Sequence, residues 1–191
     1  MNDKIILNSF DESIQVISDS KKLINDIQSV SDLIIKCFSN GNKIVIFGNG
    51  GSAADSQHFA AEFIGRFLLE RKSLPAISLT TDSSILTALG NDYSFNDIFS
   101  RQCESLVKKN DIVIAISTSG NSLNVVNGII SSKKNGANII GILGNDGGKI
   151  KDLVDLSIIV PSNSTPRIQE SHRLILHIIC DLVEQFFTNK K

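Results

Sequence analysis

Apolar side chains recur at helical spacing through the first forty residues. No glycine or proline interrupts residues 9–39. The apolar positions there are Ile14, Val16, Ile17, Leu23, Ile24, Ile27, Val30, Leu33 and Ile34. This spacing predicts one long or two consecutive amphipathic helices within residues 1–40, ended by the turn Asn40-Gly41-Asn42.

Five short apolar runs follow, each rich in isoleucine and valine. They are residues 43–47, 76–79, 112–116, 138–143 and 156–160. Runs of this length predict strands buried on both faces of a sheet. Helix-length segments separate them at 53–68, 84–108 (broken near Gly90), 122–135 and 148–153. The alternation predicts an α/β fold, with a five-stranded parallel sheet flanked by helices.

The chain ends in a further predicted helix, residues 166–188. Pro166 suits its first turn, where a missing N–H costs nothing, and Ser164 or Thr165 can cap it. No linker, repeat or low-complexity tract divides the sequence. We therefore expect one domain over residues 1–191, with N-terminal helices in 1–40 and the α/β core and C-terminal helix in 41–191.

Composition narrows the possible partners and compartments. The 191 residues suffice to bury roughly 70% of the unfolded surface, and 19 basic against 20 acidic residues form no dense cationic run. We therefore expect no nucleic-acid partner. Three cysteines outside any C-x-x-C pattern favour a reducing cytoplasm. The absence of a leader pattern and of an apolar run of ~18 residues disfavours export and membrane spanning.

A glycine-rich turn, residues 48–52 (Gly-Asn-Gly-Gly-Ser), follows the first predicted strand. It lacks the spacing of the dinucleotide and P-loop fingerprints, although its glycines allow a ligand close to the backbone at a helix N-terminus. An ordinary tight turn is the alternative. Because ligands of doubly wound sheets sit beyond the carboxyl ends of the strands, the place of this turn favours a binding role.

A second turn, residues 117–122, offers four hydroxyls after the third predicted strand. They belong to Ser117, Thr118, Ser119 and Ser122. Helix capping needs only one such group, whereas several hydroxyls beside the free N–H groups of a helix suit a phosphate. We therefore predict a phosphate site, and with it a small phosphorylated polyol as ligand.

Candidate acid, base or metal-binding side chains lie on two of the predicted helices. His58 and Glu62 are one turn apart, so they can share a metal ion, transfer a proton or form a surface pair. Gln169 and His177, on the last helix, are separated by ~12 Å of rise. Spacing alone does not choose between His177 and His172 as the partner of this site.

Several motifs together resemble the phosphoheptose isomerases, a family of SIS (sugar isomerase) domains. They are residues 48–67, 79–82, 89–93, 117–122, 146–149 and 167–170, so the resemblance covers nearly the whole chain. It implies a flavodoxin-like three-layer sandwich and a homotetramer with active sites between subunits. The implied reaction converts D-sedoheptulose 7-phosphate to D-glycero-D-manno-heptose 7-phosphate, the first step of ADP-heptose synthesis for lipopolysaccharide core.

The resemblance also implies residue roles. One Zn²⁺ per subunit would be held by His58, Glu62, Gln169 and His177. Glu62 and His177 would be the acid/base pair, which selects His177 over His172. The implied substrate-binding residues are Asn49, Gly50, Gly51, Ser52, Glu62, Asn91, Asp92, Ser117, Thr118, Ser119, Ser122 and Gln169. Pro166 departs from the small or acidic residue expected before Arg167, which puts the local loop path in question.

Two other functions remain open at this stage. A non-enzymatic SIS protein that resembles the DnaA initiator-associating protein would share the hydroxyl turn and residues 167–170, but it is expected to lack the Glu62 and His177 equivalents. A sugar-phosphate sensor, or an isomerase of a pentose phosphate, would share the phosphate site. For the isomerase, a carboxylate such as Glu62 can move a proton between C1 and C2. Because zinc binding would weaken that base, the metal is either catalytic or mainly structural.

Overall fold

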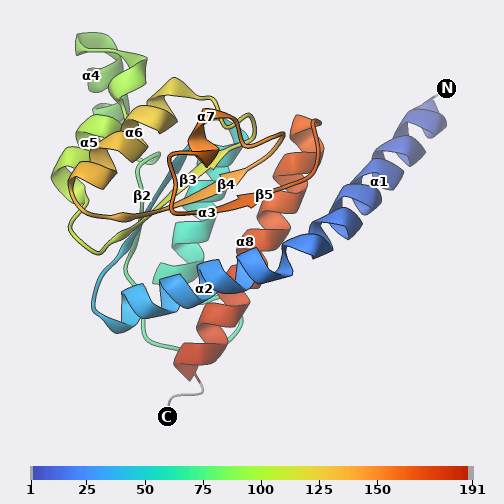
Figure 1. Ribbon diagram of the computed structural model, residues 1–191, viewed down its shortest axis with the longest axis horizontal. Coiled ribbons are helices and arrows are strands. Elements are labelled where there is room, and N and C mark those ends of the chain that lie inside the picture. The colour runs from blue at the N-terminus through green and yellow to red at the C-terminus, as the bar shows by residue number, and fades with distance from the viewer. Residues whose placement is uncertain (1, 189–191) are drawn as a thin grey trace.

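The structure is a computed structural model that describes residues 2–188. Five parallel strands form one sheet in the order β2-β1-β3-β4-β5. They are β1 (Ile44–Gly48), β2 (Ala76–Ser78), β3 (Ile112–Ser117), β4 (Asn138–Leu143) and β5 (Leu156–Ile159). Helices cover both faces of this sheet (Figure 1), so the predicted α/β class and its five parallel strands are confirmed.

Burial differs between the centre and the edges of the sheet. Every residue of β1 and β3 is buried, as the isoleucine- and valine-rich runs predict. In the edge strand β2, Ile77 is 37% exposed, and β5 is only partly buried. The prediction of burial on both faces is therefore wrong for the edges, because an edge strand has a neighbour on one side only.

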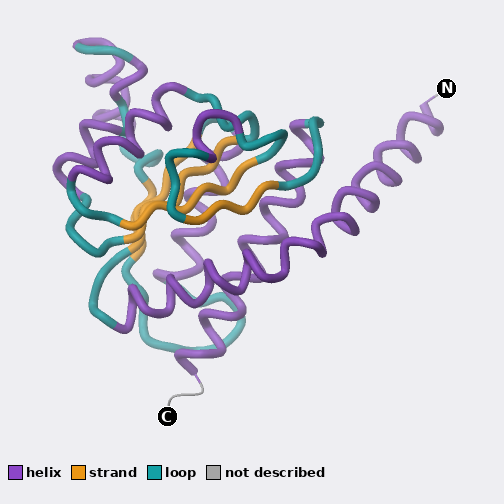
Figure 2. Tube along the Cα trace, viewed as in Figure 1, coloured by secondary structure: helices purple, strands orange, loops and turns teal. Residues whose placement is uncertain are grey.

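The predicted N-terminal helical stretch consists of two helices, α1 (Asn2–Asp19) and α2 (Ile24–Ser39), joined by the 3₁₀ turn Ser20–Leu23. α2 packs on the sheet, whereas α1 stands clear of it (Figure 1, Figure 2). No residue of α1 is buried. Its large exposed apolar side chains are Ile5, Ile6, Leu7, Phe10 and Ile14.

Two helical layers enclose two apolar cores. α2, α3 (Gly51–Ile64) and α8 (Thr165–Thr188) cover one face of the sheet. The opposite layer contains α4 (Ser83–Asp92), α5 (Ser100–Leu106), α6 (Leu123–Lys134) and α7 (Gly148–Lys151). Pro166 is the second residue of α8, so this departure from the family pattern fits the first helical turn.

Two predicted helix boundaries are corrected. The segment predicted at 53–68 starts at Gly51 and already ends at Ile64. The break predicted near Gly90 falls after Asp92, because Gly90 continues α4 and Ser94 caps the 3₁₀ turn Phe95–Asp97 through the Asn96 N–H.

A buried ion pair holds the segment that follows α3. Glu184 on α8 accepts hydrogen bonds from three consecutive backbone N–H groups, those of Phe67, Leu68 and Leu69, at 2.8, 2.6 and 2.7 Å. Its carboxylate also lies 3.2 Å from Nε of Arg71. Burial alone would raise the pKa of Glu184, but the three N–H groups and Arg71 outweigh it and lower that pKa.

All three cysteines are free thiols buried in these cores. Burial raises the pKa of Cys37 and of Cys103 to about 11. It also raises the pKa of Cys180, with Glu62 as the next contribution. Among the described residues, no helix is long and apolar enough to span a membrane.

Candidate active site

The two turns singled out in the sequence meet at the point where the strand order reverses. The chain passes from β1 to β2 on one side and then returns to β3 on the other side of β1. Gly48 at the end of β1 is therefore paired with Ile116 near the end of β3. In open α/β sheets this reversal point forms a crevice for ligands.

The glycine turn allows a close approach that side chains would block. A Cβ at Gly48 would lie 2.7 Å from the Ile116 carbonyl oxygen. Gly50 has φ +55°, a backbone conformation that favours glycine, immediately before α3. The Asn49 and Asn124 side-chain amides exchange two hydrogen bonds of 2.9 Å, which tie this turn to the start of α6.

The hydroxyl turn does not serve simply as a helix cap. Ser122 occupies the N-cap position of α6, but its side chain makes no capping bond. Ser117 Oγ accepts the Gly120 N–H at 3.1 Å and lies 3.4 Å from Ser122 Oγ. Ser119 Oγ accepts the Asn121 N–H at 3.2 Å. The hydroxyls are thus gathered beside the first turn of α6, where an anion is favoured.

Helices α3 and α8 run side by side in the same direction, with matched contacts along their length. Near the start of each, a Cβ at Gly51 would lie 2.5 Å from Gln169 Nε2. One turn later, Arg173 Nη2 donates to Asp55 Oδ1 at 2.7 Å. These contacts place the next turn of α8 beside the end of α3.

Three predicted metal-binding side chains converge at that end. His58 Nε2 lies 2.8 Å from Glu62 Oε1, and the rings of His58 and His177 are 5.1 Å apart. Donor atoms of His58, Glu62 and His177 all lie within 4.8 Å of one another. The ring of Phe67 covers His177 at 5.5 Å. Two imidazoles and a carboxylate are a typical donor set for zinc.

Gln169 and His172 occupy earlier positions on α8 than His177. The Gln169 side chain packs against Gly51, ~12 Å of helical rise before His177. His172 is buried, with its Nε2 2.9 Å from the Leu143 carbonyl oxygen. Burial lowers the pKa of His172, against a smaller opposite effect of that bond. His172 is therefore a core residue, whereas His177 lies beside His58.

Asn91 and Asp92 are not brought to the other predicted site residues within one chain. They end α4, in the helical layer opposite α3 and α8 (Figure 1). Both are exposed, and Asn91 Nδ2 donates to Asp92 Oδ1 at 2.8 Å. No contact among residues 2–188 joins this pair to the hydroxyl turn or the donor cluster.

Two hollows adjoin the glycine turn and the helix that carries His177. One of about 170 Å³ lies over the glycine turn and includes Gly48, Asn49 and Gly50 in its lining. The other, of about 490 Å³, follows one face of α8. Its lining residues are Pro166, Gln169, Glu170, Arg173, Leu174 and His177.

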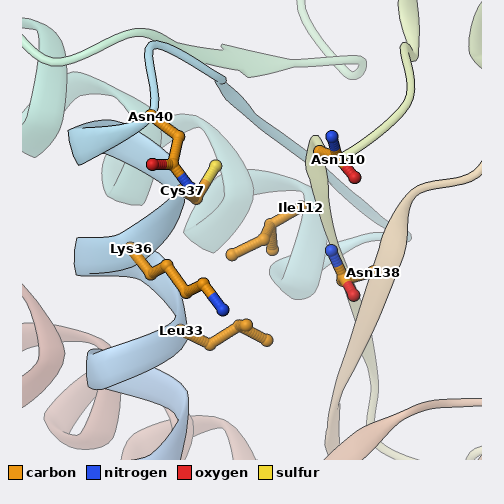
Figure 3. A pocket seen from close by; sticks show the side chains of 7 residues that line it. All are labelled: Leu33, Lys36, Cys37, Asn40, Asn110, Ile112 and Asn138. Carbon is orange, nitrogen blue, oxygen red and sulfur yellow. The ribbon is translucent and has the colours of Figure 1, made fainter.

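A further pocket, of about 310 Å³, lies at the opposite end of the sheet. Figure 3 shows Leu33 and Lys36 of α2 facing Ile112 and Asn138 across it. Because it opens at the amino ends of β3 and β4, it is separate from the crevice, and none of its lining residues belongs to the predicted site.

Comparison with known proteins shows the family to which this chain belongs. A model of the SIS domain matches residues 9–144. A phosphoheptose isomerase of Geobacter sulfurreducens is 55% identical over 165 residues, which cover 86% of this chain and 87% of the relative. This chain belongs to the phosphoheptose isomerase family of SIS domains.

Solved phosphoheptose isomerases share the whole architecture. That of Neisseria gonorrhoeae has a TM-score of 0.92 and 40% identity, covering 97% of this chain and 100% of the other. That of Francisella tularensis has a TM-score of 0.94 and 33% identity, covering 97% and 99%. The sandwich and its N-terminal helices are thus features of the phosphoheptose isomerase fold.

The sequence interpretation missed Asp55 and Arg173. Asp55 lies one turn after Gly51 and one turn before His58, so helical spacing already puts it on the same face of α3. Arg173 lies midway between Gln169 and His177. That spacing was the available signal, but the pairing of the two charges depends on how α3 and α8 are aligned.

Proposed function

We propose that this chain is a ketose-aldose isomerase that converts D-sedoheptulose 7-phosphate to D-glycero-D-manno-heptose 7-phosphate. Membership of the phosphoheptose isomerase family supports the substrate. The observation that carries the chemistry is the convergence of His58, Glu62 and His177 within 4.8 Å. Such a group can both hold a metal ion and move protons.

Zn²⁺ is the proposed cofactor, one per subunit. The donors of His58, Glu62 and His177 fit this ion in type and mutual distance. Gln169 is the fourth proposed ligand, although it needs to reach the cluster from its place beside Gly51. Bound zinc would polarise the carbonyl and hydroxyl oxygens of the sugar as a Lewis acid.

Glu62 and His177 are the proposed acid/base pair. The isomerisation removes a proton from C1 of the ketose and returns one to C2, while a hydroxyl proton passes from O1 to O2. Glu62, whose side chain is 20% exposed, would carry the proton between the carbons. His177 would carry the proton between the oxygens. Phe67 packs on the His177 ring and would limit the access of water to it.

The phosphate would lie at the hydroxyl turn. Four hydroxyls would hydrogen-bond to it beside the N-terminus of α6, those of Ser117, Thr118, Ser119 and Ser122. Because the helix N-terminus itself favours an anion, these neutral donors can bind the phosphate without a lysine. The proposed sugar contacts come from Asn49, Gly50, Gly51, Ser52, Glu62, Asn91, Asp92 and Gln169. Within residues 2–188, no hydrogen bond joins Asn91 or Asp92 to the other proposed contacts, which favours a site completed by another subunit.

We propose a homotetramer with its active sites between subunits. The apolar side chains of α1, including Phe10, are exposed on a helix with no buried residue. A second copy could bury them, since a contiguous exposed apolar face commonly marks an interface. We place the enzyme in the cytoplasm, in the synthesis of ADP-heptose for lipopolysaccharide core. The phosphorylated substrate and the three free thiols fit this compartment.

The test is a turnover assay on the purified protein with sedoheptulose 7-phosphate. Aldose formation is followed with and without a chelator and after addition of Zn²⁺. Conversion that the chelator suppresses and Zn²⁺ restores supports both the isomerase and its metal. Conversion unaffected by the chelator assigns no role to an exchangeable metal, and no conversion under any metal condition rejects the isomerase.

The alternative partner-binding function is not favoured. A protein resembling the DnaA initiator-associating protein would not need Glu62 and His177 beside His58, and the relatives described above are named as isomerases. An isomerase of a pentose phosphate remains distinguishable by comparing both sugars in the same assay.

A further inference from the structure

Arg173 lies on α8 midway between two residues of the proposed site. Gln169 is one turn before it and His177 one turn after it, so the three side chains leave α8 along one stripe. All three line the hollow of about 490 Å³ on this face. Arg173 lies outside the sequence motifs on which the resemblance to the family rests.

A buried carboxylate fixes one edge of the Arg173 guanidinium. Nε and Nη2 donate to Asp55 Oδ1 at 3.1 and 2.7 Å. The Asp55 side chain is 3% exposed, whereas that of Arg173 is 55% exposed. A charge-assisted bond to a buried partner restricts the arginine rotamer, so the guanidinium has a defined position at the wall of the hollow.

The other edge of this guanidinium is available to a ligand. Among the described residues, no hydrogen bond engages Nη1 of Arg173. Glu170 also lines the hollow, but its carboxylate is bound elsewhere, to Arg167 at 3.0 Å and to the Ser13 hydroxyl at 2.7 Å. The hollow therefore contains a positioned donor without a competing acid at hydrogen-bond distance.

The place of Arg173 corresponds to the middle of the proposed substrate. The start of α8 lies near the hydroxyl turn, because a Cβ at Gly144 would meet both Ile168, at 2.6 Å, and the Thr118 carbonyl oxygen, at 2.8 Å. The other end of the stripe is the donor cluster at His177. If the phosphate of the sugar lay at the hydroxyl turn and its reacting carbons lay at the donor cluster, the hydroxyls in the middle of the sugar chain would lie beside Arg173.

We propose that Arg173 is a further substrate-binding residue, which donates from Nη1 to hydroxyl oxygens in the middle of the sugar chain. Asp55 is its positioning residue. The inference rests on the proposed isomerase function and deepens it, because these contacts would favour a seven-carbon over a five-carbon ketose phosphate. A shorter chain has fewer hydroxyls between its phosphate and its carbonyl.

The experiment measures both binding and turnover on the zinc-loaded, full-length protein. Arg173→Met removes the donors, and Arg173→Lys keeps the charge but loses the fork. Because Arg173→Met leaves Asp55 buried and unpaired, Asp55→Asn/Arg173→Met is made as well, and thermal unfolding is recorded for each. Lys133→Met is the control, since Lys133 is a half-exposed cation near Asp155, at the other end of the sheet.

We expect Arg173→Met and the double variant to raise KM and the calorimetric Kd for sedoheptulose 7-phosphate about tenfold, the effect of one charge-assisted hydrogen bond. kcat should change little, and inhibition by inorganic phosphate should not change. The preference for sedoheptulose 7-phosphate over ribulose 5-phosphate should decrease. Arg173→Lys should be intermediate, and Lys133→Met should match the wild type.

Two results would overturn the proposal. If Kd and KM were unchanged in Arg173→Met and in the double variant, Arg173 would not bind the substrate. Its role would then be limited to pairing with the buried charge of Asp55. If inhibition by inorganic phosphate weakened in parallel with the rise in KM, Arg173 would bind the phosphate group of the substrate instead of its hydroxyls. Wild-type protein that binds sedoheptulose 7-phosphate without turnover would reject the isomerase but still allow the Kd comparison.

Discussion

Glu62 is the residue at which the proposed metal binding and the proposed proton transfer would compete for one carboxylate. Its Oε1 lies 2.8 Å from His58 Nε2, and its backbone carbonyl accepts a hydrogen bond from Arg71 Nη2 at 2.6 Å. The backbone at Glu62 is therefore fixed, while the side chain faces the cluster. A carboxylate placed in this way could serve a metal ion or a substrate carbon while the backbone of the helix stays in place.

Glu62→Gln tests the proposed base. The amide keeps the size of the side chain but cannot accept a proton from C1, so we expect turnover to fall by ~10²–10⁴ or more. The measurement is kcat at saturating sedoheptulose 7-phosphate, with circular dichroism and light scattering as checks on fold and assembly. Retention of most activity would remove Glu62 from this role.

His58→Ala tests the metal site. Removing one of three converging donors should lower zinc affinity, since each ligand contributes to a tetrahedral site. Zinc content is measured by atomic absorption after equilibration with a metal buffer. Gln57→Ala is the control, because Gln57 lies on the same helix but bonds to Thr80. Equal metal content in the two variants would mean that the ion binds elsewhere.

At the scale of elements, the common alignment of α3 and α8 positions the residues of the proposed site. Their contacts in order are Gly51 with Gln169, Asp55 with Arg173, and His58 with His177. The segment after α3 is joined to α8 by Glu184 and Arg71, so the same two helices are linked again beyond Glu62. This second link stabilises the end of α3 and the position of Phe67.

Glu184→Ala should therefore reduce stability strongly. Three backbone N–H groups and the Arg71 charge would lose their partner in a buried place, which costs roughly 3–5 kcal/mol. Urea denaturation measures the loss, and Gln185→Ala, at an exposed neighbouring position, should change stability by less than about 0.5 kcal/mol.

The pH dependence of this contribution follows from the lowered pKa of Glu184. The stabilisation is present above the pKa of the unfolded chain, ~4.3 for a glutamate, and is lost as the pH falls through the lower folded value. The difference between wild type and Glu184→Ala should therefore shrink in acid. A difference that stays constant down to that region would contradict an ionised Glu184.

The elements themselves were largely predictable from sequence, because runs such as residues 138–143 have one stable environment, a buried strand. The end of α3 was not, because Gly65 after Ile64 is an ambiguous local signal: Gly65 caps α3, whereas Gly90 continues α4. Helix α3 ends where the next residues find backbone partners on Glu184, more than a hundred positions later. Likewise, spacing could not separate His172 from His177, because their difference depends on the neighbouring Leu143 and His58.

At the scale of the whole molecule, α1 is the element whose apolar side chains stay uncovered in a single chain. Phe10 is 65% exposed on a helix that stands clear of the sheet (Figure 1). Asn91 and Asp92 are separated from the other proposed substrate contacts. Association of several copies would address both, by covering the apolar side chains and by bringing α4 of one copy to the site of another.

Phe10→Asp should therefore weaken assembly. A charge placed in a buried apolar contact is unfavourable, so we expect smaller species in light scattering at micromolar protein, and lower activity if the sites are shared. Ile130→Asp, a change at a partly exposed position on α6, is the control. An unchanged mass for Phe10→Asp would exclude α1 from the interface.

The three buried cysteines give the protein an internal reporter of opening. With the pKa of Cys37 and Cys103 raised to about 11, almost no thiolate exists near neutral pH, and burial keeps alkylating reagents away. The native protein should therefore resist oxidants and label only when it opens. Cys180 lies on α8 near Glu62, so its rate of alkylation would report how often α3 and α8, the two helices of the proposed active site, separate.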